Sequence, residues 1–153
     1  TEVKDGAFYG WPYVYFKDYA DPTQIQLNPD KVKQAKQTSL MPDLPLDAHS
    51  VPLGLLFHSG KNIDGKYKDG AFVVRRGGVS TSKLTGYDVL FIPFIDGKPT
   101  GIIETFLSGF IASEDRGEIF GRPVGIAETN NGEIIITDDV GGRLLMISST
   151  EKE

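Results

Sequence analysis

Short apolar runs separated by glycine-bearing turns dominate the second half of the chain. In residues 121–148, three such runs are divided by turns at 130–132 and 139–142. Because Asn and Gly accept the positive φ angles of tight hairpins, this stretch predicts an antiparallel meander of three strands. Such a meander is most of one blade of a β-propeller.

The same pattern extends over residues 51–107. The apolar runs there lie at 51–58, 71–75, 87–95 and 100–106, with turns at 68–70 and 96–98. Four successive strands make one blade-sized unit. We therefore predict about two blades, one at 51–107 and, after a loop at 108–121, a final blade within 108–153.

Residues 1–50 do not continue this pattern. Residues 8–16 are densely aromatic and include Pro12, so we predict a buried loop or edge segment whose rings cover a core. Residues 17–47 are polar and contain four prolines, which predicts a long surface excursion with at most a helical turn at 31–36. The fold class expected for 1–153 is thus a single all-β domain, a partial propeller with an aromatic loop segment at 1–50.

Composition supports this class. The chain has 39% hydrophobic residues, 18 glycines and 9 prolines, which favours a turn-rich β protein over a helical bundle. Its formal net charge of −5 gives no basic field for nucleic acid or anionic lipid, and no apolar run approaches the roughly 20 residues of a membrane helix. The absence of cysteine excludes disulfides, thiolate catalysis and thiolate metal sites.

Two blades cannot close a ring. Open blades leave unpaired sheet edges, which are prone to associate. We expect the remaining blades to come from another chain, from self-association or from sequence that is missing here. The chain starts at Thr1 rather than methionine, so either a leader was removed or this is a piece of a longer protein.

Four sequence motifs, in order, carry a resemblance to a known family. They are Tyr-Gly-Trp-Pro at 9–12, His-Ser-Val-Pro-Leu-Gly-Leu at 49–55, Gly-Tyr-Asp-Val at 86–89 with Asp-Gly-Lys-Pro-Thr-Gly at 96–101, and Gly-Arg-Pro-Val-Gly at 121–125 with Asp-Asp-Val-Gly-Gly-Arg at 138–143. Together they resemble the C-terminal part of the soluble sugar dehydrogenases that use pyrroloquinoline quinone (PQQ), the glucose, aldose and sorbosone dehydrogenase family.

The resemblance implies a six-bladed β-propeller exported to the periplasm or beyond the cell. It implies PQQ at the mouth of the central channel beside a calcium ion, and a sugar whose anomeric hydroxyl gives its proton to a histidine while hydride passes to the quinone. In the family, both that histidine and the calcium loop lie upstream of the motif at 9–12. We therefore assign no catalytic residue and no metal ligand, and expect the chain alone to be inactive on sugar.

Arginines are the strongest candidates for cofactor binding. Arg122 precedes a strand, offers a bidentate cation to the carboxylates of the quinone, and matches a cofactor-contacting arginine of the family; the alternative is an exposed loop arginine. Arg75 and Arg76 end another strand, so one should face the channel and the other solvent. The family's Gly-Ser-Trp-Asn-Arg-like segment is replaced after them by Gly-Gly-Val-Ser-Thr-Ser at 77–82. His49 is a fourth candidate, for the cofactor rim or a bound sugar; alternatively, it bonds loop backbone.

Other side chains receive structural interpretations. Asp138 and Asp139 could suggest calcium, but they lack further spaced ligands, so we predict a turn in which Asp side chains bond the backbone. His58 is predicted to be a surface residue without a role. Trp11 could stack on a sugar together with Tyr9, Tyr13 and Tyr15, although packing in a core is the favoured interpretation.

Two other functions remain open. The chain could be a non-catalytic binding or scaffolding module that keeps the propeller architecture. It could also belong to a sugar-lactone hydrolase propeller, but that activity needs a calcium constellation that we cannot assemble from these residues. Whether the chain is an enzyme by itself is left undecided.

Overall fold

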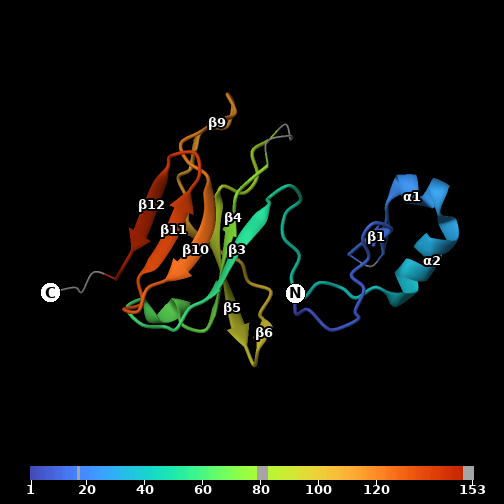
Figure 1. The fold of residues 1–153 in the computed structure, drawn as a ribbon, viewed down its shortest axis with the longest axis horizontal. Helices are drawn as coiled ribbons and strands as arrows, with labels where there is room; N and C mark the ends of the chain where they lie inside the picture. The colour runs from blue at the N-terminus through green and yellow to red at the C-terminus, as the bar shows by residue number, and fades with distance from the viewer. Residues whose placement is uncertain (17, 79–82, 150–153) are drawn as a thin grey trace. The chain divides into compact units, whose positions relative to one another are not determined.

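The computed structural model describes residues 1–16, 18–78 and 83–149, and the chain divides into two compact units, Thr1–Pro45 and Leu46–Glu153. The larger unit consists of antiparallel sheets, which confirms the prediction of an all-β, propeller-like fold (Figure 1). The assignment of 1–153 to one domain stays a prediction. In the described part of the chain, no helix has both the length and the hydrophobicity needed to cross a bilayer.

The first sheet corresponds to the blade predicted at 51–107. Its strands are β3 (Pro52–Phe57), β4 (Gly70–Arg75), β5 (Asp88–Ile95), β6 (Lys98–Pro99) and β7 (Glu104–Leu107), with a 3-10 helix η1 (Gly65–Tyr67) before β4. β4 lies between β3 and β5, and β6 and β7 both pair with β5. The strand predicted at 100–106 begins only at Glu104, because Gly101 adopts a φ of +88° that interrupts the extended chain.

The second sheet is the predicted three-stranded meander. It consists of β10 (Pro123–Glu128), β11 (Ile134–Asp138) and β12 (Arg143–Ile147), in that order. The segment at 108–121 was expected to be a loop, but it contains a small hairpin of β8 (Ile111–Ser113) and β9 (Glu118–Ile119). The turn between these strands includes Gly117, whose φ is +64°.

The two sheets of this unit pack face to face around one core. Figure 1 shows the second sheet, in orange to red, beside β3 and β4 of the first, in green. The fully buried side chains of this core are Phe72, Val74, Val89 and Phe91 from the first sheet and Ile134 and Ile136 from the second. Each such side chain contributes about 1.5–3 kcal/mol of burial, so the meanders stabilise each other as neighbouring blades do.

Gly54 lies where β3 packs against β10. A Cβ atom there would stand 3.0 Å from Ile126 Cγ2 and 3.1 Å from the Val124 carbonyl oxygen. The absence of a side chain at Gly54 therefore lets β3 approach β10.

Each sheet also has a second face, turned away from this core, which we call its outer face. On the first sheet, the strand register places Leu55 beside Val73 and Phe57 beside Ala71, and Leu55 and Phe57 are 63% and 59% exposed. On the second sheet, the outer face carries Met146, which is 67% exposed. Both outer faces are thus apolar and partly exposed, whereas the sides of a single sandwich would be polar.

The smaller unit corrects two predictions for residues 1–50. Instead of one helical turn, it contains α1 (Pro22–Leu27) and α2 (Pro29–Thr38) beside a short hairpin of β1 (Val14–Tyr15) and β2 (Tyr19–Ala20). Asp21 caps α1 through its side chain, prolines begin both helices, and Val32 and Ala35 of α2 bury against Val14. Val32 and Ala35, at positions i and i+3, are the buried residues that hold α2 against the hairpin. An apolar stripe of two residues is too narrow to predict a helix from the sequence.

The aromatic segment of this unit is less buried than expected. Trp11, predicted to pack in a core, is 83% exposed, and Tyr15 is 52% exposed. Phe8 and Tyr13 do pack against the small core around Val14, as predicted. The Tyr15 ring stacks on Tyr19 with centroids 5.5 Å apart. Part of this segment therefore packs its rings against each other at the surface instead of in a core.

Candidate functional site

All four predicted binding residues, His49, Arg75, Arg76 and Arg122, lie at one end of the two sheets. β3 and β5 begin there and β4 ends, since Pro52 pairs with Arg75 and Arg75 pairs with Asp88. β10 and β12 begin there and β11 ends, since Pro123 pairs with Asp138. We call this end the loop rim; its segments are 49–52, 75–78, 86–88, 121–123 and 138–140.

Backbone strain is concentrated at the loop rim. His49, Val51 and Tyr87 have φ angles of +62°, +50° and +63°. The left-handed region is costly for residues with a side chain, most of all for a β-branched valine. Such strain persists only where the surroundings fix the conformation, and it is typical of binding and catalytic sites.

Three glycines of the loop rim allow its loops to interlock. A Cβ at Gly77 would lie 2.3 Å from the Tyr87 ring, one at Gly78 would lie 2.4 Å from the His49 carbonyl oxygen, and one at Gly86 would lie 2.7 Å from the Ser50 carbonyl oxygen. The Tyr87 hydroxyl donates to the Gly78 carbonyl oxygen at 3.0 Å, and its ring is buried. These close approaches hold the two loops of the first sheet in one arrangement.

Arg76 and Arg122, one from each sheet, meet at the same carboxylate. Arg122 Nε donates to Asp139 Oδ1, and Arg76 Nε lies 3.6 Å from Asp139 Oδ2. The side chains of Arg76, Arg122 and Asp139 are 29%, 22% and 37% exposed. The cluster therefore carries one net positive charge at a position that a solute can reach.

Asp138, next to Asp139, fixes the loop that carries Arg122. Its Oδ1 accepts the backbone N–H groups of Arg122 at 2.8 Å, Val140 at 3.2 Å and Gly141 at 2.9 Å, and its Oδ2 binds Arg143 at 2.7 Å. Burial by itself raises the pKa of Asp138, but the Gly141 and Arg122 N–H groups and Arg143 outweigh it and lower the pKa to about 2. The predicted turn, in which an Asp side chain bonds the backbone, is confirmed.

Arg75 has a different environment from Arg76. It is buried, and each of its three guanidinium nitrogens donates to a carboxylate: Nε and Nη2 to Asp88 at 2.7 and 2.6 Å, and Nη1 to Asp47 at 2.7 Å. The hydrogen bonds that Arg75 donates to Asp88 are the main reason that the pKa of Arg75 is raised. Arg75 thus ties β4 to β5, and it does not join Arg76 and Arg122 at Asp139.

The two histidines differ from each other. His49 is exposed at the loop rim, and its assignment to a ligand stays a prediction. His58 was expected at the surface, but its side chain is fully buried. Its Nε2 donates to the Gly132 carbonyl oxygen and its Nδ1 accepts the Gly60 N–H, both at 2.9 Å, so it links β3 to the turn between β10 and β11. The sequence predicted a surface position because it does not show that this turn folds back over the end of β3.

The loop rim fits an anionic, carboxylate-bearing cofactor. Arg76 and Arg122 are reachable guanidinium groups that already share a carboxylate, and carboxylates are the bidentate partners that arginine prefers. The family segment expected after Arg76 falls at 79–82, outside the described residues. Among the residues that the structure describes, no three His, Cys, Asp or Glu side chains gather as a metal site.

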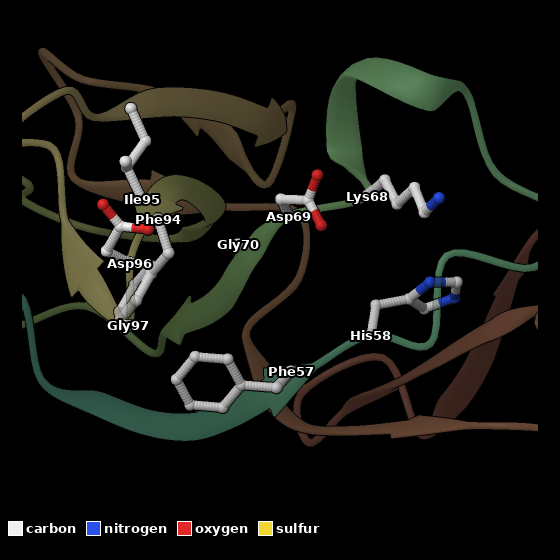
Figure 2. A pocket seen from close by; sticks show the side chains of 9 residues that line it. All are labelled: Phe57, His58, Lys68, Asp69, Gly70, Phe94, Ile95, Asp96 and Gly97. Carbon is white, nitrogen blue, oxygen red and sulfur yellow. The ribbon is translucent and has the colours of Figure 1, made fainter.

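A shallow hollow lies at the opposite end of the first sheet, where β3 and β5 end and β4 begins. Figure 2 shows His58 and Lys68 on one side of it and Phe94, Ile95 and Asp96 on the other. His58 is held by backbone partners, and the hollow contains none of the residues predicted to bind a cofactor. The loop rim therefore remains the candidate site.

Sequence reasoning missed two residues of this site. Asp139 was predicted only as a turn residue, yet it bridges the two arginines. Tyr87 was quoted only as part of a family motif and a strand, although its ring packs on Gly77. The sequence did offer a signal for Asp139. One aspartate is enough to bond the backbone of the turn, so the second aspartate of the Asp138–Asp139 pair is free for another role. No local signal shows the contact of Tyr87 with Gly77, which depends on strand pairing.

A family model named TrAA12-like matches residues 4–150. A curated protein from Borreliella burgdorferi (strain ATCC 35210), named only as uncharacterized, is 32% identical over 150 residues, which are 96% of this chain and 37% of that protein.

Solved structures of low identity share the fold. One is the iodide structure of a Trichoderma reesei carbohydrate-active enzyme of family AA12, with a TM-score of 0.72, 17% identity and coverage of 95% of this chain and 40% of that chain. Another is the holo form of the pyranose dehydrogenase PQQ domain from Coprinopsis cinerea, with a TM-score of 0.67, 19% identity and coverage of 93% and 40%. The chain spans about two fifths of the length of these relatives.

Proposed function

The chain belongs to the TrAA12-like family, and on this basis we propose that it is the C-terminal portion of a PQQ-dependent sugar dehydrogenase. The family match confirms the resemblance drawn from the four sequence motifs. The similar pyranose dehydrogenase PQQ domain supports a sugar as substrate. Within this proposal, an aldose or a keto-aldose such as sorbosone is the substrate class, and the protein acts in the periplasm or outside the cell.

The observation that carries the proposal is the convergence of Arg76 and Arg122 at the strained loop rim. Their guanidinium groups would hold a carboxylate of the quinone at the ends of the two sheets. When bound, PQQ supplies a two-electron acceptor for the hydride of the sugar. Gly77, Gly78 and Gly86 keep the loops of the first sheet close together beside Arg76.

The proton of the sugar must be accepted elsewhere in the whole protein. His58 is buried and uses both ring nitrogens in hydrogen bonds to backbone groups. His49 lies exposed at the loop rim, and we propose for it a contact with the cofactor or the sugar. A general base must reach the proton that it removes, and the family resemblance places that base in an earlier blade.

Further blades of a propeller are the partner that we propose. The outer faces carry exposed apolar side chains, including Leu55, Phe57 and Met146, which fit the packing of one blade on the next. Their source is the rest of a longer protein, another chain or a second copy. A scaffolding module without cofactor binding is the second candidate function, because these same faces would serve it equally well.

The test is PQQ binding by the 153-residue chain, followed by quinone absorbance and fluorescence titration. We expect weak binding that Arg76→Gln and Arg122→Gln each reduce by about tenfold, as for loss of a charged hydrogen bond. The matched control is Arg116→Gln, which removes an arginine that is 70% exposed and pairs with Glu118 at the β8–β9 turn. It should bind PQQ as the unchanged chain does.

Two outcomes would contradict the proposal. If PQQ binding is insensitive to both Arg76→Gln and Arg122→Gln, the cofactor does not use the loop rim, and the scaffolding function is favoured. If the isolated chain reduces a dye with an aldose at a substantial rate in the presence of PQQ and calcium, the remaining blades are not required for catalysis.

A further inference from the structure

We propose that Asp139 is an internal counter-ion that occupies Arg76 and Arg122 when no ligand is bound, and that a carboxylate of the ligand displaces it. Asp139 would then set the affinity of the loop rim and select ligands with a negative charge. This inference rests on the proposed function, since it requires that the two arginines bind the cofactor.

Asp139 differs from its neighbour in what its carboxylate does. Asp138 is 2% exposed and is committed to three backbone N–H groups and Arg143, so it cannot leave without loss of the turn. Within the described residues, the contacts given for the Asp139 carboxylate are with the two guanidinium groups, and its side chain is 37% exposed. Its departure therefore leaves the turn intact.

The backbone around Asp139 is anchored, so only its side chain needs to move. The Asp139 N–H donates to the Arg122 carbonyl oxygen at 3.1 Å, and the Arg122 N–H donates to Asp138. The Arg76 N–H donates to the Val51 carbonyl oxygen at 2.9 Å. The backbone that carries each arginine thus stays in place while rotation of the Asp139 side chain turns its carboxylate toward water.

The energetics allow an exchange. Ion pairs that water can reach contribute little to stability, because water competes for both partners, and these side chains are 22–37% exposed. A ligand carboxylate offers the same two oxygen atoms to the same two arginines, while the displaced Asp139 regains its hydration. A neutral ligand offers no such compensation, so the exchange discriminates by charge.

The experiment compares Asp139→Asn with the unchanged chain, using PQQ and its neutral trimethyl ester as probes. We expect Asp139→Asn to bind PQQ on the order of fivefold to tenfold more tightly, as for loss of two competing half-exposed pairs, and to bind the ester with unchanged affinity. Asp115→Asn removes the same charge from an exposed loop and should leave both affinities unchanged. Thermal unfolding of Asp139→Asn should match that of the unchanged chain within a few degrees.

The outcomes separate this inference from the proposed function. If Arg76→Gln and Arg122→Gln weaken PQQ binding but Asp139→Asn does not tighten it, the inference fails and the function stands. If Asp139→Asn weakens binding, Asp139 positions the arginines instead of competing for them, which also overturns the inference. Binding of PQQ by Asp139→Asn where the unchanged chain shows none supports it, and absence of binding by every variant contradicts both proposals.

Discussion

Arg75 and Asp88 face each other across β4 and β5 and form a buried ion pair with two parallel hydrogen bonds of 2.7 and 2.6 Å. The pair lies one residue before Arg76, so the same strand end carries one arginine that stabilises the sheet and one that is reachable by a ligand. Of these two neighbouring arginines, Arg75 therefore stabilises the fold, and Arg76 is the one available for binding.

Loss of one partner of this pair should destabilise the protein. Asp88→Asn leaves the Arg75 guanidinium buried with an incomplete set of acceptors, which should cost about 2–4 kcal/mol of unfolding free energy. Urea denaturation followed by circular dichroism measures it. Arg76→Gln is the matched comparison and should cost less than about 1 kcal/mol; equal urea midpoints for the two variants would refute this assignment of roles.

A side chain at Gly77 should disturb the loop rim. Gly77→Ala places a Cβ 2.3 Å from the Tyr87 ring at a φ of +86°, so both a clash and backbone strain result. We expect a loss of more than about 2 kcal/mol in chemical denaturation. Gly97→Ala isolates the strain, because Gly97 has a φ of +75° and nothing within 4 Å of its Cβ position. It should cost only about 1 kcal/mol, and an equal cost for both would disprove the close contact.

Acid should weaken the fold partly through Asp138. Its pKa falls from 3.8 to about 2 on folding, so between these values the unfolded chain binds more protons than the folded one. Its contribution, about 1–2 kcal/mol, is complete above pH 4 and is lost as the pH falls toward 2. Unfolding measured from pH 5 to 2 should show a shallower decline for Asp138→Asn than for Asp115→Asn, and parallel declines would contradict the prediction.

His58 should matter more to stability than its chemistry suggests. His58→Phe keeps a ring in the buried position but removes the partners of the Gly132 carbonyl and the Gly60 N–H. Two unsatisfied backbone groups should cost about 2–4 kcal/mol. His49→Asn, at the exposed histidine, should cost less than about 0.5 kcal/mol because asparagine tolerates its positive φ. Thermal and urea unfolding of both variants measure this difference, and equal losses of stability would contradict the prediction.

The outer faces should drive association. Leu55→Lys and Met146→Lys change side chains that are 63% and 67% exposed, so the fold should lose less than about 1 kcal/mol. Light scattering across a range of concentrations should show larger species for the unchanged chain and fewer for these variants. Ser113→Lys, on the separate β8–β9 hairpin, is the control for added charge. Unchanged association in the Leu55 and Met146 variants would show that these faces are not docking surfaces.

The sequence predicted most of the fold because sheets leave a strong local pattern. Short apolar runs and glycine turns located β3, β4 and β5 within one or two residues and predicted the meander of β10 to β12. The two helices were missed because only Val32 and Ala35 bury, and His58 was misplaced because a turn remote in sequence covers it.

The candidate site was only partly predictable. Cation chemistry pointed first to Arg122, but it did not separate Arg75 from Arg76, because the partners of a guanidinium depend on strand register. Likewise, the choice of Asp139 over Asp138 as the bridging carboxylate depends on which one caps the turn, a matter of geometry.

Gly54 touches neither arginine, yet the gap between the sheets narrows at this residue. Because the two arginines come from different sheets, a methyl group at Gly54, two residues from the loop rim, would push β3 and β10 apart close to the site. The residue at position 54 therefore sets the distance between Arg76 and Arg122, and with it the size of the anion that both can bind, although Gly54 makes no contact with that anion.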